Sequence, residues 1–393
     1  MPDVDLDSPR AVLGMDAERL SAHMRIQKKK IFPTTGEKTL RKFGSSEAAA
    51  LLGVGESHLR QLTIDGQGPA PEIGKGGRRA YSLGQINELR EFFAKKRNDP
   101  SFVRHRRRGE KLQVLSIANF KGGCGKTTTA AHLAQYLALQ GYRVLAIDLD
   151  AQASLTTLYG IQPEIDVGPD ESLYGAIRFE DPRAMKDVIR KTYFDGLDVI
   201  PANIELTEFE HDTPLDIRRN GGDGFFSRVG NSIAEVDSLY DVVVIDCPPH
   251  LGFLTMSALC ASNGLIITVH PQMIDVASMS QFLMMLHDLL DVALGKNDSE
   301  NLENVRYLVT RYEPTDGPQT QMAAFLRSMF EGRVLTSPML KSTAIADAGI
   351  TKQTLYELGR EWFTRSTYDR AKEAMDAVNR EIEGLLKSSW GRP

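Results

Sequence analysis

The sequence predicts an α/β fold with a mostly parallel sheet, preceded by a smaller and mainly helical module. Three observations predict it: a glycine-rich loop between an apolar run and a helix, two further apolar runs that end in aspartate, and a basic N-terminal part. The chain has 393 residues, of which 41% are hydrophobic and 25% are charged. A chain of this kind can bury a full α/β core and still supply about a hundred residues for a second module.

A glycine-rich loop at residues 121–128 is the most informative feature of the sequence. The apolar run 112–118 before it predicts a buried strand, and residues 127–140 predict a helix that ends at Gly141. Between a strand and a helix, such a loop turns backbone N–H groups toward phosphate oxygens, while a lysine contacts phosphate and a hydroxyl contacts Mg²⁺. Phe120 stands where the ordinary motif has its first glycine, so the match is to the variant K-G-G-x-G-K-[ST]-[ST]. The predicted nucleotide-binding residues are Lys121, Gly122, Gly123, Cys124, Gly125, Lys126, Thr127 and Thr128.

Two strands that end in aspartate are predicted behind this loop. The apolar run 143–147 leads to Asp148 and Asp150, and the run 240–245 leads to Asp246. A single aspartate at a strand end is more often a turn former or a helix cap. Two such ends behind one phosphate-binding loop favour a nucleotide site, because parallel sheets bind ligands at the carboxyl ends of their strands.

Together, the loop and the two strand ends resemble the ParA/MinD group of deviant Walker ATPases. Residues 121–128 match the Walker A motif, 147–152 the A′ motif and 242–246 the Walker B motif. The sequence of the A′ motif is similar to that of ParA, except that Ala151 replaces proline, and it is unlike that of MinD. The resemblance covers residues 112–390, roughly the last three quarters of the chain. His270 followed by Asp275 and Ser278 fits the plasmid ParA branch.

The resemblance implies an ATPase that uses Mg²⁺ and forms a dimer around two ATP molecules. It implies that Lys126 holds the phosphates and that Thr127 and Asp246 hold Mg²⁺, directly or through water. Asp150 is implied to orient the attacking water. Lys121 is implied to reach the phosphates of the facing subunit's ATP, as an arginine finger does. The predicted catalytic residues are Lys121, Lys126 and Asp150.

The N-terminal part of the chain is basic, unlike the rest. Residues 1–110 contain 21 Lys and Arg against 14 Asp and Glu, whereas residues 111–393 contain 26 against 38. This asymmetry favours a polyanionic partner for the front part. Residues 45–52 and a second short stretch through Leu59 and Leu62 predict two helices joined by a glycine turn, which is the helix-turn-helix pattern.

A basic hairpin and a third helix are predicted after these two helices. Residues 70–81 predict the hairpin, and Ser82 is the predicted cap of the following helix. The segment resembles the MerR-like winged helix-turn-helix ahead of the ATPase in long plasmid ParA proteins, although Gly55 replaces the usual serine. A helical hairpin that only packs, with a solvated basic loop, is the alternative interpretation. The predicted DNA-binding residues are His58, Arg60, Lys75, Arg78 and Arg79.

The remaining segments complete the predicted organisation. Residues 16–30 predict a helix that we interpret as a dimer contact, and the run 104–108 is interpreted as a solvated linker that could also touch phosphates. The last helix, 368–386, has an apolar stripe interleaved with acidic residues, which favours packing on the sheet over a MinD-like membrane contact. Arg360 and Arg365 form a candidate surface for non-specific DNA. The predicted domains are an N-terminal helix or dimerisation segment (1–40), a winged helix-turn-helix domain (41–103), a basic linker (104–111) and a ParA-type ATPase domain (112–393).

Two negative observations narrow the function. The sequence has neither a signal peptide nor a transmembrane run, so we expect a soluble, intracellular protein with no membrane partner. The resemblance to ParA implies a cytoplasmic, nucleoid-associated location. The three cysteines, Cys124, Cys247 and Cys260, have neither metal-ligand nor disulfide spacing. This spacing weighs against the nitrogenase iron protein, which shares the loop but needs cysteines that ligate a cluster.

The whole sequence therefore resembles a deviant-Walker P-loop ATPase preceded by an all-α/winged helix-turn-helix DNA-binding domain, most similar to the RepA proteins of repABC plasmids. This resemblance implies plasmid partitioning, operator binding as an autorepressor, non-specific binding to nucleoid DNA, and a ParB/RepB-type centromere-binding partner. The alternative is a DNA-binding repressor in which the nucleotide only switches conformation, with negligible turnover. A membrane-cycling ATPase of the MinD type is disfavoured by the N-terminal module and the acidic last helix.

Overall fold

The computed structural model describes residues 9–31, 38–221, 224–294 and 302–392. The chain divides into two compact units, residues 1–39 and residues 40–393. The described part of the first unit is one helix, α1 (Pro9–Ile31), which begins seven residues earlier than the predicted helix 16–30. Its role in dimer contacts stays a prediction.

A seven-stranded sheet organises the second unit. Its strand order is β10-β9-β4-β8-β5-β7-β6, and all neighbouring strands are parallel except the antiparallel pair β6 and β7. This arrangement confirms the mostly parallel sheet that the sequence predicts. The strands are β4 (Gln113–Ala118), β5 (Val144–Asp148), β6 (Arg190–Lys191), β7 (Leu197–Ile200), β8 (Val242–Asp246), β9 (Gly264–Val269) and β10 (Asn304–Val309).

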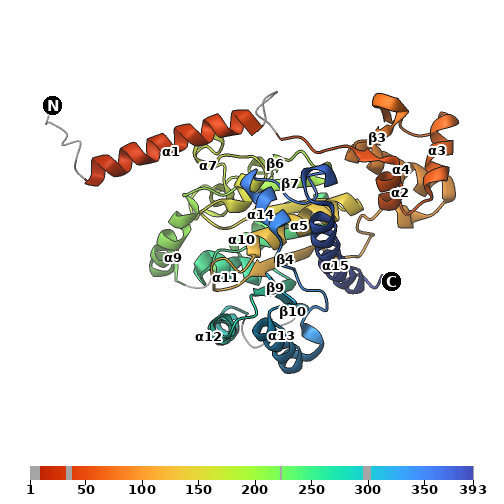
Figure 1. Ribbon diagram of the computed structural model, residues 1–393. Coiled ribbons are helices and arrows are strands. Elements are labelled where there is room, and N and C mark those ends of the chain that lie inside the picture. Colours follow the sequence, from red (N-terminus) through yellow and green to blue (C-terminus); the bar gives the residue numbers. More distant parts are fainter. Residues whose placement is uncertain (1–8, 32–37, 222–223, 295–301, 393) are drawn as a thin grey trace, which may run out of the picture. The chain divides into compact units, whose positions relative to one another are not determined.

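Helices cover both faces of this sheet (Figure 1). Alternate residues of the central strands point to opposite faces, so that Val242 and Val244 of β8 join one core and Val243 and Ile245 the other. Strands buried on both sides are largely apolar, and β5 and β8 are apolar up to their final aspartates. The helices are α5 (Lys126–Gln140), α6 (Ser154–Leu158), α7 (Pro163–Asp166), α8 (Leu173–Ile177), α9 (Leu206–Asn220), α10 (Arg228–Glu235), α11 (Phe253–Cys260), α12 (Met273–Leu294), α13 (Gly317–Phe330), α14 (Thr343–Ile350) and α15 (Arg365–Ser389).

The packing of α5 and α15 places the nucleotide-binding loop. Both helices lie on the same face of the sheet, where the apolar stripe of α15 is buried through residues such as Met375 and Ile382. This placement agrees with the predicted packing of the last helix on the sheet. Helix α5 ends at Gly141, which adopts a left-handed conformation with φ of +92°, as the sequence predicts.

The segment between residues 40 and 97 contains all three predicted helices and a small antiparallel sheet. The sheet has the order β1-β3-β2, and its last two strands form the predicted basic hairpin. Gly53, with φ of +69°, ends the first helix, and Gly55 is the N-cap of the second. The elements are β1 (Phe43–Gly44), α2 (Ser45–Leu52), α3 (Glu56–Ile64), β2 (Glu72–Ile73), β3 (Arg79–Tyr81) and α4 (Leu83–Arg97).

This N-terminal module, residues 40–97, shares a hydrophobic core with α5 and α15. Arg90 of α4 is 4% exposed and donates a hydrogen bond of 2.5 Å to the Leu139 carbonyl, near the end of α5. Arg106, within the run interpreted as a solvated linker, pairs with Asp237 and has a side chain only 10% exposed. The basic run is therefore anchored to the sheet at Arg106, because neighbouring acidic and carbonyl groups of the sheet domain satisfy its guanidinium.

Candidate nucleotide site

The loop between β4 and α5 turns at two glycines that adopt left-handed conformations. Gly123 has φ of +74° and Gly125 has φ of +87°, a region that residues with a Cβ rarely adopt. An added Cβ at Gly125 would also lie 3.6 Å from the side chain of Thr310. The Thr310 hydroxyl donates a hydrogen bond of 2.7 Å to the Cys124 carbonyl. The loop is therefore fixed against the residue that follows β10.

Lys126 lies inside the curve of this loop. It is 7% exposed, and its Nζ donates to the Lys121 carbonyl over 3.1 Å. The buried Cys124 thiol donates to the same carbonyl over 3.0 Å. The ammonium group is thus surrounded by the loop, where a phosphate group would meet it.

Two carboxylates meet behind the loop at the ends of neighbouring strands. Asp148 of β5 is in register with Asp246 of β8, and both are buried. Asp148 accepts hydrogen bonds from the backbone N–H and the hydroxyl of Thr156, at 2.8 and 2.7 Å. Burial raises the pKa of Asp148 to about 6, in spite of these hydrogen bonds. Asp148 therefore holds the segment that follows β5. Its Oδ2 accepts both of these hydrogen bonds and is not free to bind a cation.

Asp246 has no comparable partner. Neither of its carboxylate oxygens accepts a hydrogen bond from any residue that the structure describes. Burial, and then the neighbouring Asp148 carboxylate, raise the pKa of Asp246 well above its usual range. Thr127 and Lys126 oppose this rise, although the Thr127 hydroxyl falls short of hydrogen-bond geometry. A buried carboxylate without a partner is costly, and a bound cation would remove that cost, so Asp246 and Thr127 fit the predicted Mg²⁺ site.

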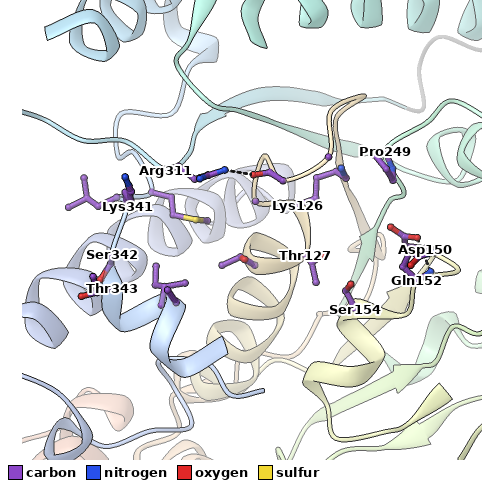
Figure 2. A pocket seen from close by; sticks show the side chains of 18 residues that line it. Lys126, Thr127, Asp150, Gln152, Ser154, Pro249, Arg311, Lys341, Ser342 and Thr343 are labelled. Carbon is purple, nitrogen blue, oxygen red and sulfur yellow. Dashed lines mark hydrogen bonds between the residues drawn. The ribbon is translucent and has the colours of Figure 1, made fainter. Parts of the chain in front are cut away.

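The loop, Thr127 and Asp150 line a hollow of about 670 Å³ at the carboxyl ends of the strands, which we call the nucleotide hollow (Figure 2). Asp150 is half-buried at its edge, and its Oδ1 accepts a hydrogen bond of 3.0 Å from the Gln152 N–H. Figure 2 shows Asp150 and Gln152 on one side of the hollow and Lys341 to Thr343 on the other. The nucleotide-binding residues that the sequence predicts are thus gathered here, except Lys121 and Cys124.

One wall of the nucleotide hollow was missed by sequence reasoning. Arg311 is the second residue after β10, and its guanidinium donates to the Gly123 carbonyl over 3.2 Å (Figure 2). The rule that places ligands at strand ends could have identified it. The rest of the wall belongs to the segment after α13, which packs against the end of β10. There the Met339 N–H donates a hydrogen bond of 2.8 Å to the Val309 carbonyl. This missed wall consists of Arg311, Met339, Leu340, Lys341, Ser342, Thr343, Ile345 and Ala346.

Lys121 points away from the nucleotide hollow. Its ammonium forms an ion pair with the Asp275 carboxylate of α12, and the other oxygen of Asp275 lies 3.1 Å from Nδ1 of His270. These three side chains border a smaller hollow of about 250 Å³, which we call the lysine hollow. The two hollows share Gly122 and Gly123 of the loop. Of the two loop lysines, Lys126 therefore lines the nucleotide hollow and Lys121 lines the lysine hollow.

The candidate DNA-binding residues lie on the N-terminal module. His58 and Arg60 are exposed on α3, Arg78 is exposed after the hairpin tip, and Arg79 is half-buried in β3. The side chain of Lys75 lies outside what the structure describes. The exposed residues are available to a partner, but their roles stay predictions.

The second candidate DNA surface lies at the start of α15. Arg365 is exposed there, and Arg360 is exposed but forms an ion pair with Asp369. A phosphate group would have to replace this carboxylate at Arg360, so Arg365 is the freer contact of the two.

Comparison with known proteins identifies the family. A family profile described as an AAA domain matches residues 112–297. A Rhizobium rhizogenes protein provisionally named replication protein A is 54% identical over 387 residues, which cover 98% of this chain and 96% of that protein. The chromosome partitioning protein ParA of Caulobacter vibrioides is 30% identical over 237 residues, which cover 60% of this chain and 84% of that protein. This chain belongs to the ParA family.

A solved structure also resembles this ParA-family chain. Cobyrinic acid a,c-diamide synthase from Mycobacterium smegmatis, with a bound ATP analogue and magnesium, is 26% identical with a TM-score of 0.55. The match covers 70% of this chain and 94% of the synthase. The resemblance to ParA and the α/β P-loop fold, both predicted from the three motifs, are therefore confirmed. Among the described residues of this ParA-family chain, no helix is both long and apolar enough to span a membrane.

Proposed function

We propose that this ParA-family chain is a DNA-partitioning ATPase that hydrolyses ATP with Mg²⁺ between two subunits. The observation that carries the proposal is the buried Asp246 carboxylate, which has no hydrogen-bond partner among the described residues and lies beside Thr127 and Lys126. Such a carboxylate gains a partner when a cation binds next to the phosphates. The related synthase, which binds an ATP analogue and magnesium, supports the same two ligands here.

We infer the roles of the loop and strand-end residues from their positions. Phosphoryl transfer to water depends mainly on positioning and on neutralising charge. Lys126 and the loop N–H groups bind the phosphates, and Thr127 and Asp246 hold Mg²⁺, directly or through water. Mg²⁺, when bound, neutralises charge on the β and γ phosphates. Asp150, half-buried at the edge of the nucleotide hollow, orients the attacking water.

Lys121 acts on the ATP of the facing subunit. Its ammonium is paired with Asp275 and does not line the nucleotide hollow of its own chain. A cation in that position can neutralise the transition state of a second site when two subunits meet across their loops. Hydrolysis then requires a homodimer, and the loop of each subunit serves both nucleotides.

The N-terminal module acts as a winged helix-turn-helix that binds operator DNA. Its support is the pair of helices α2 and α3 joined by a glycine turn, followed by the basic hairpin of β2 and β3. His58 and Arg60 would contact base edges, while Lys75, Arg78 and Arg79 would contact phosphates. Operator binding of this kind makes the protein an autorepressor, as the resemblance to long plasmid ParA proteins implies.

We propose that the chain has four domains, with the limits 1–40, 41–103, 104–111 and 112–393. The ATPase domain would bind nucleoid DNA without sequence preference in its ATP-bound dimer, with Arg360 and Arg365 on the contact surface. A ParB/RepB-type centromere-binding protein would stimulate turnover and release the dimer from DNA. Support for this cycle is the similarity to the Caulobacter vibrioides chromosome partitioning protein ParA.

ATP turnover measured with the protein alone, with DNA, and with DNA plus the centromere-binding partner tests this proposal. We expect slow turnover alone and several-fold stimulation by the two additions together. The Lys126→Ala protein, prepared in the same way, reports the contaminating ATPase background. A nucleotide-switched repressor would instead bind operator in a nucleotide-dependent manner and show only that background in every mixture.

A further inference from the structure

The backbone of Lys121 is fixed by the loop, whereas its side chain is not. The Lys121 N–H donates to Oδ1 of Asn119 over 3.1 Å, and the Lys121 carbonyl accepts from Lys126 and Cys124. The side chain is 40% exposed and leaves the loop toward α12, where it meets Asp275. The position of this ammonium is therefore set by its carboxylate partner, since the loop holds only the main chain.

Asp275 is built to hold a positive charge. It lies in the first turn of α12, where the helix dipole favours a carboxylate, and it is only 5% exposed. One oxygen pairs with Lys121, and the other lies 3.1 Å from Nδ1 of His270. A buried carboxylate requires such partners. His270, which follows β9, is the fixed partner of Asp275, and Lys121 of the loop is the exchangeable one.

The ion pair and the proposed catalytic contact exclude each other. A Lys121 ammonium that reaches the phosphate of a facing subunit must leave Asp275, because a side chain cannot occupy both places. The lysine hollow adjoins the nucleotide hollow, since Gly122, Gly123 and Arg311 line both. Because Lys121 is partly exposed, an approaching phosphate can replace the carboxylate without any rearrangement of the loop backbone.

Resting on the proposed action of Lys121 on the second subunit, we propose that Asp275 is a positioning residue that holds this lysine until a second subunit presents its ATP. Turnover then begins only when a phosphate of the facing subunit's ATP displaces the Asp275 carboxylate from the Lys121 ammonium. Asp275→Asn keeps the size of the side chain and removes its charge. It should free Lys121, raise turnover in the absence of DNA, and reduce the stimulation that DNA and partner add.

Lysine reactivity tests the holding role without reference to catalysis. The full-length, nucleotide-free protein is treated with an acetylating reagent, and the rate at Lys121 is read by peptide mass spectrometry, with Lys341 as the internal reference. In Asp275→Asn, Lys121 should react about two- to fivefold faster, the factor that a partly exposed ion pair contributes. Asp288→Asn removes the same charge from an exposed position of α12 and should leave the rate unchanged. Asp275→Glu, which keeps the charge, should remain protected and guards against an effect of misfolding.

A double-mutant comparison connects this reactivity to turnover. Asp275→Asn should raise DNA-independent turnover in the wild-type background and have no effect in the Lys121→Ala background. An unchanged acetylation rate at Lys121 in Asp275→Asn would overturn the holding role. Normal turnover in Lys121→Ala would instead defeat the proposed function itself, so the two failures are distinguishable.

Discussion

At the scale of single residues, the nucleotide site separates three strand-end aspartates by their surroundings. Asp148 is buried and hydrogen-bonded to Thr156, Asp246 is buried without such a bond among the described residues, and Asp150 is half-buried at the edge of the hollow. We propose that these identical side chains have a structural, a metal-binding and a water-orienting role, respectively. The roles follow from burial and hydrogen bonding, because these decide which oxygen remains free for a ligand.

Replacing Lys126 should abolish useful ATP affinity. Lys126→Ala removes the only loop ammonium that lies within the curve of the loop in the described structure. We expect affinity for ATP to fall roughly 10- to 100-fold, the range for a lost charged hydrogen bond. Isothermal titration measures it, with the exposed Lys111→Ala as the control. Wild-type affinity in Lys126→Ala would be incompatible with the P-loop assignment.

Asp150 and Asp246 should fail in different ways. Asp150→Ala should bind ATP and Mg²⁺ but hydrolyse ATP at least about 100-fold more slowly, because the water is no longer oriented. Asp246→Asn should require a higher Mg²⁺ concentration for ATP binding, because the free carboxylate is lost. Nucleotide titrations at several Mg²⁺ concentrations and single-turnover hydrolysis separate the two. Equal loss of ATP binding in both variants would contradict this division of roles.

Asp246→Asn should also stabilise the nucleotide-free protein at neutral and alkaline pH. The pKa of Asp246 is raised in the folded state, mainly by burial, so the wild type loses stability as pH rises above about 4, the unfolded value. Asparagine does not titrate. The melting temperature of the Asp246→Asn protein should exceed that of the wild type by about 2 to 5 °C at pH 8, and the difference should vanish toward pH 4. A thermal shift series over pH, without nucleotide, decides the matter; an equal difference at every pH would argue against a buried, unpaired carboxylate.

At the scale of elements, the sequence predicted the pieces that depend on local pattern. The strand before the loop, helix α5 and its end at Gly141 were all predictable, because apolar runs, glycine and helix periodicity are local signals. Non-local placements were not. The bond from Arg90 to Leu139 joins residues 49 positions apart, and the wall from Met339 to Ala346 reaches the site only through the return of the chain to the sheet. No spacing in the sequence encodes these contacts.

The proposed DNA contacts of the N-terminal module are of two kinds, to bases and to phosphates, and substitutions at Arg60 and Arg79 should affect DNA binding differently. A base contact at Arg60 on α3 should cost about 1 to 3 kcal/mol on the operator only, whereas a phosphate contact at Arg79 should weaken binding to all DNA and reduce the salt dependence. Binding of Arg60→Ala and Arg79→Ala to operator and random DNA at two salt concentrations measures this. Arg327→Ala, on α13, serves as the control.

The result that would contradict this assignment is unchanged operator binding in the Arg60→Ala, Arg79→Ala double variant. The N-terminal module would then be a packing or dimerisation module. DNA binding would move to the basic run 104–108 or to the surface that carries Arg360 and Arg365.

At the scale of the whole molecule, we propose that the chain holds its own nucleotide but not all of the catalytic groups that act on it. Lys126, Thr127, Asp150 and Asp246 are near one nucleotide hollow, whereas Lys121 is turned toward Asp275 and the lysine hollow. The sequence predicted Lys121 as a catalytic residue by resemblance, but its ion pair depends on α12, 154 residues further on. Under the proposed mechanism, a complete site requires two copies of the chain.

Mixing two inactive variants tests this central claim most directly. Lys121→Ala lacks the lysine offered to the other subunit, and Asp150→Ala lacks the water-orienting group of its own site. In a mixed dimer, the Lys121→Ala subunit keeps Asp150 and receives Lys121 from its partner, so one of two sites is complete. With equal amounts, ATP turnover should recover to about one quarter of the wild-type rate, because half of the dimers are mixed and each has one working site. Turnover that stays at the level of the separate variants, although mixed dimers are shown to form, would contradict the account.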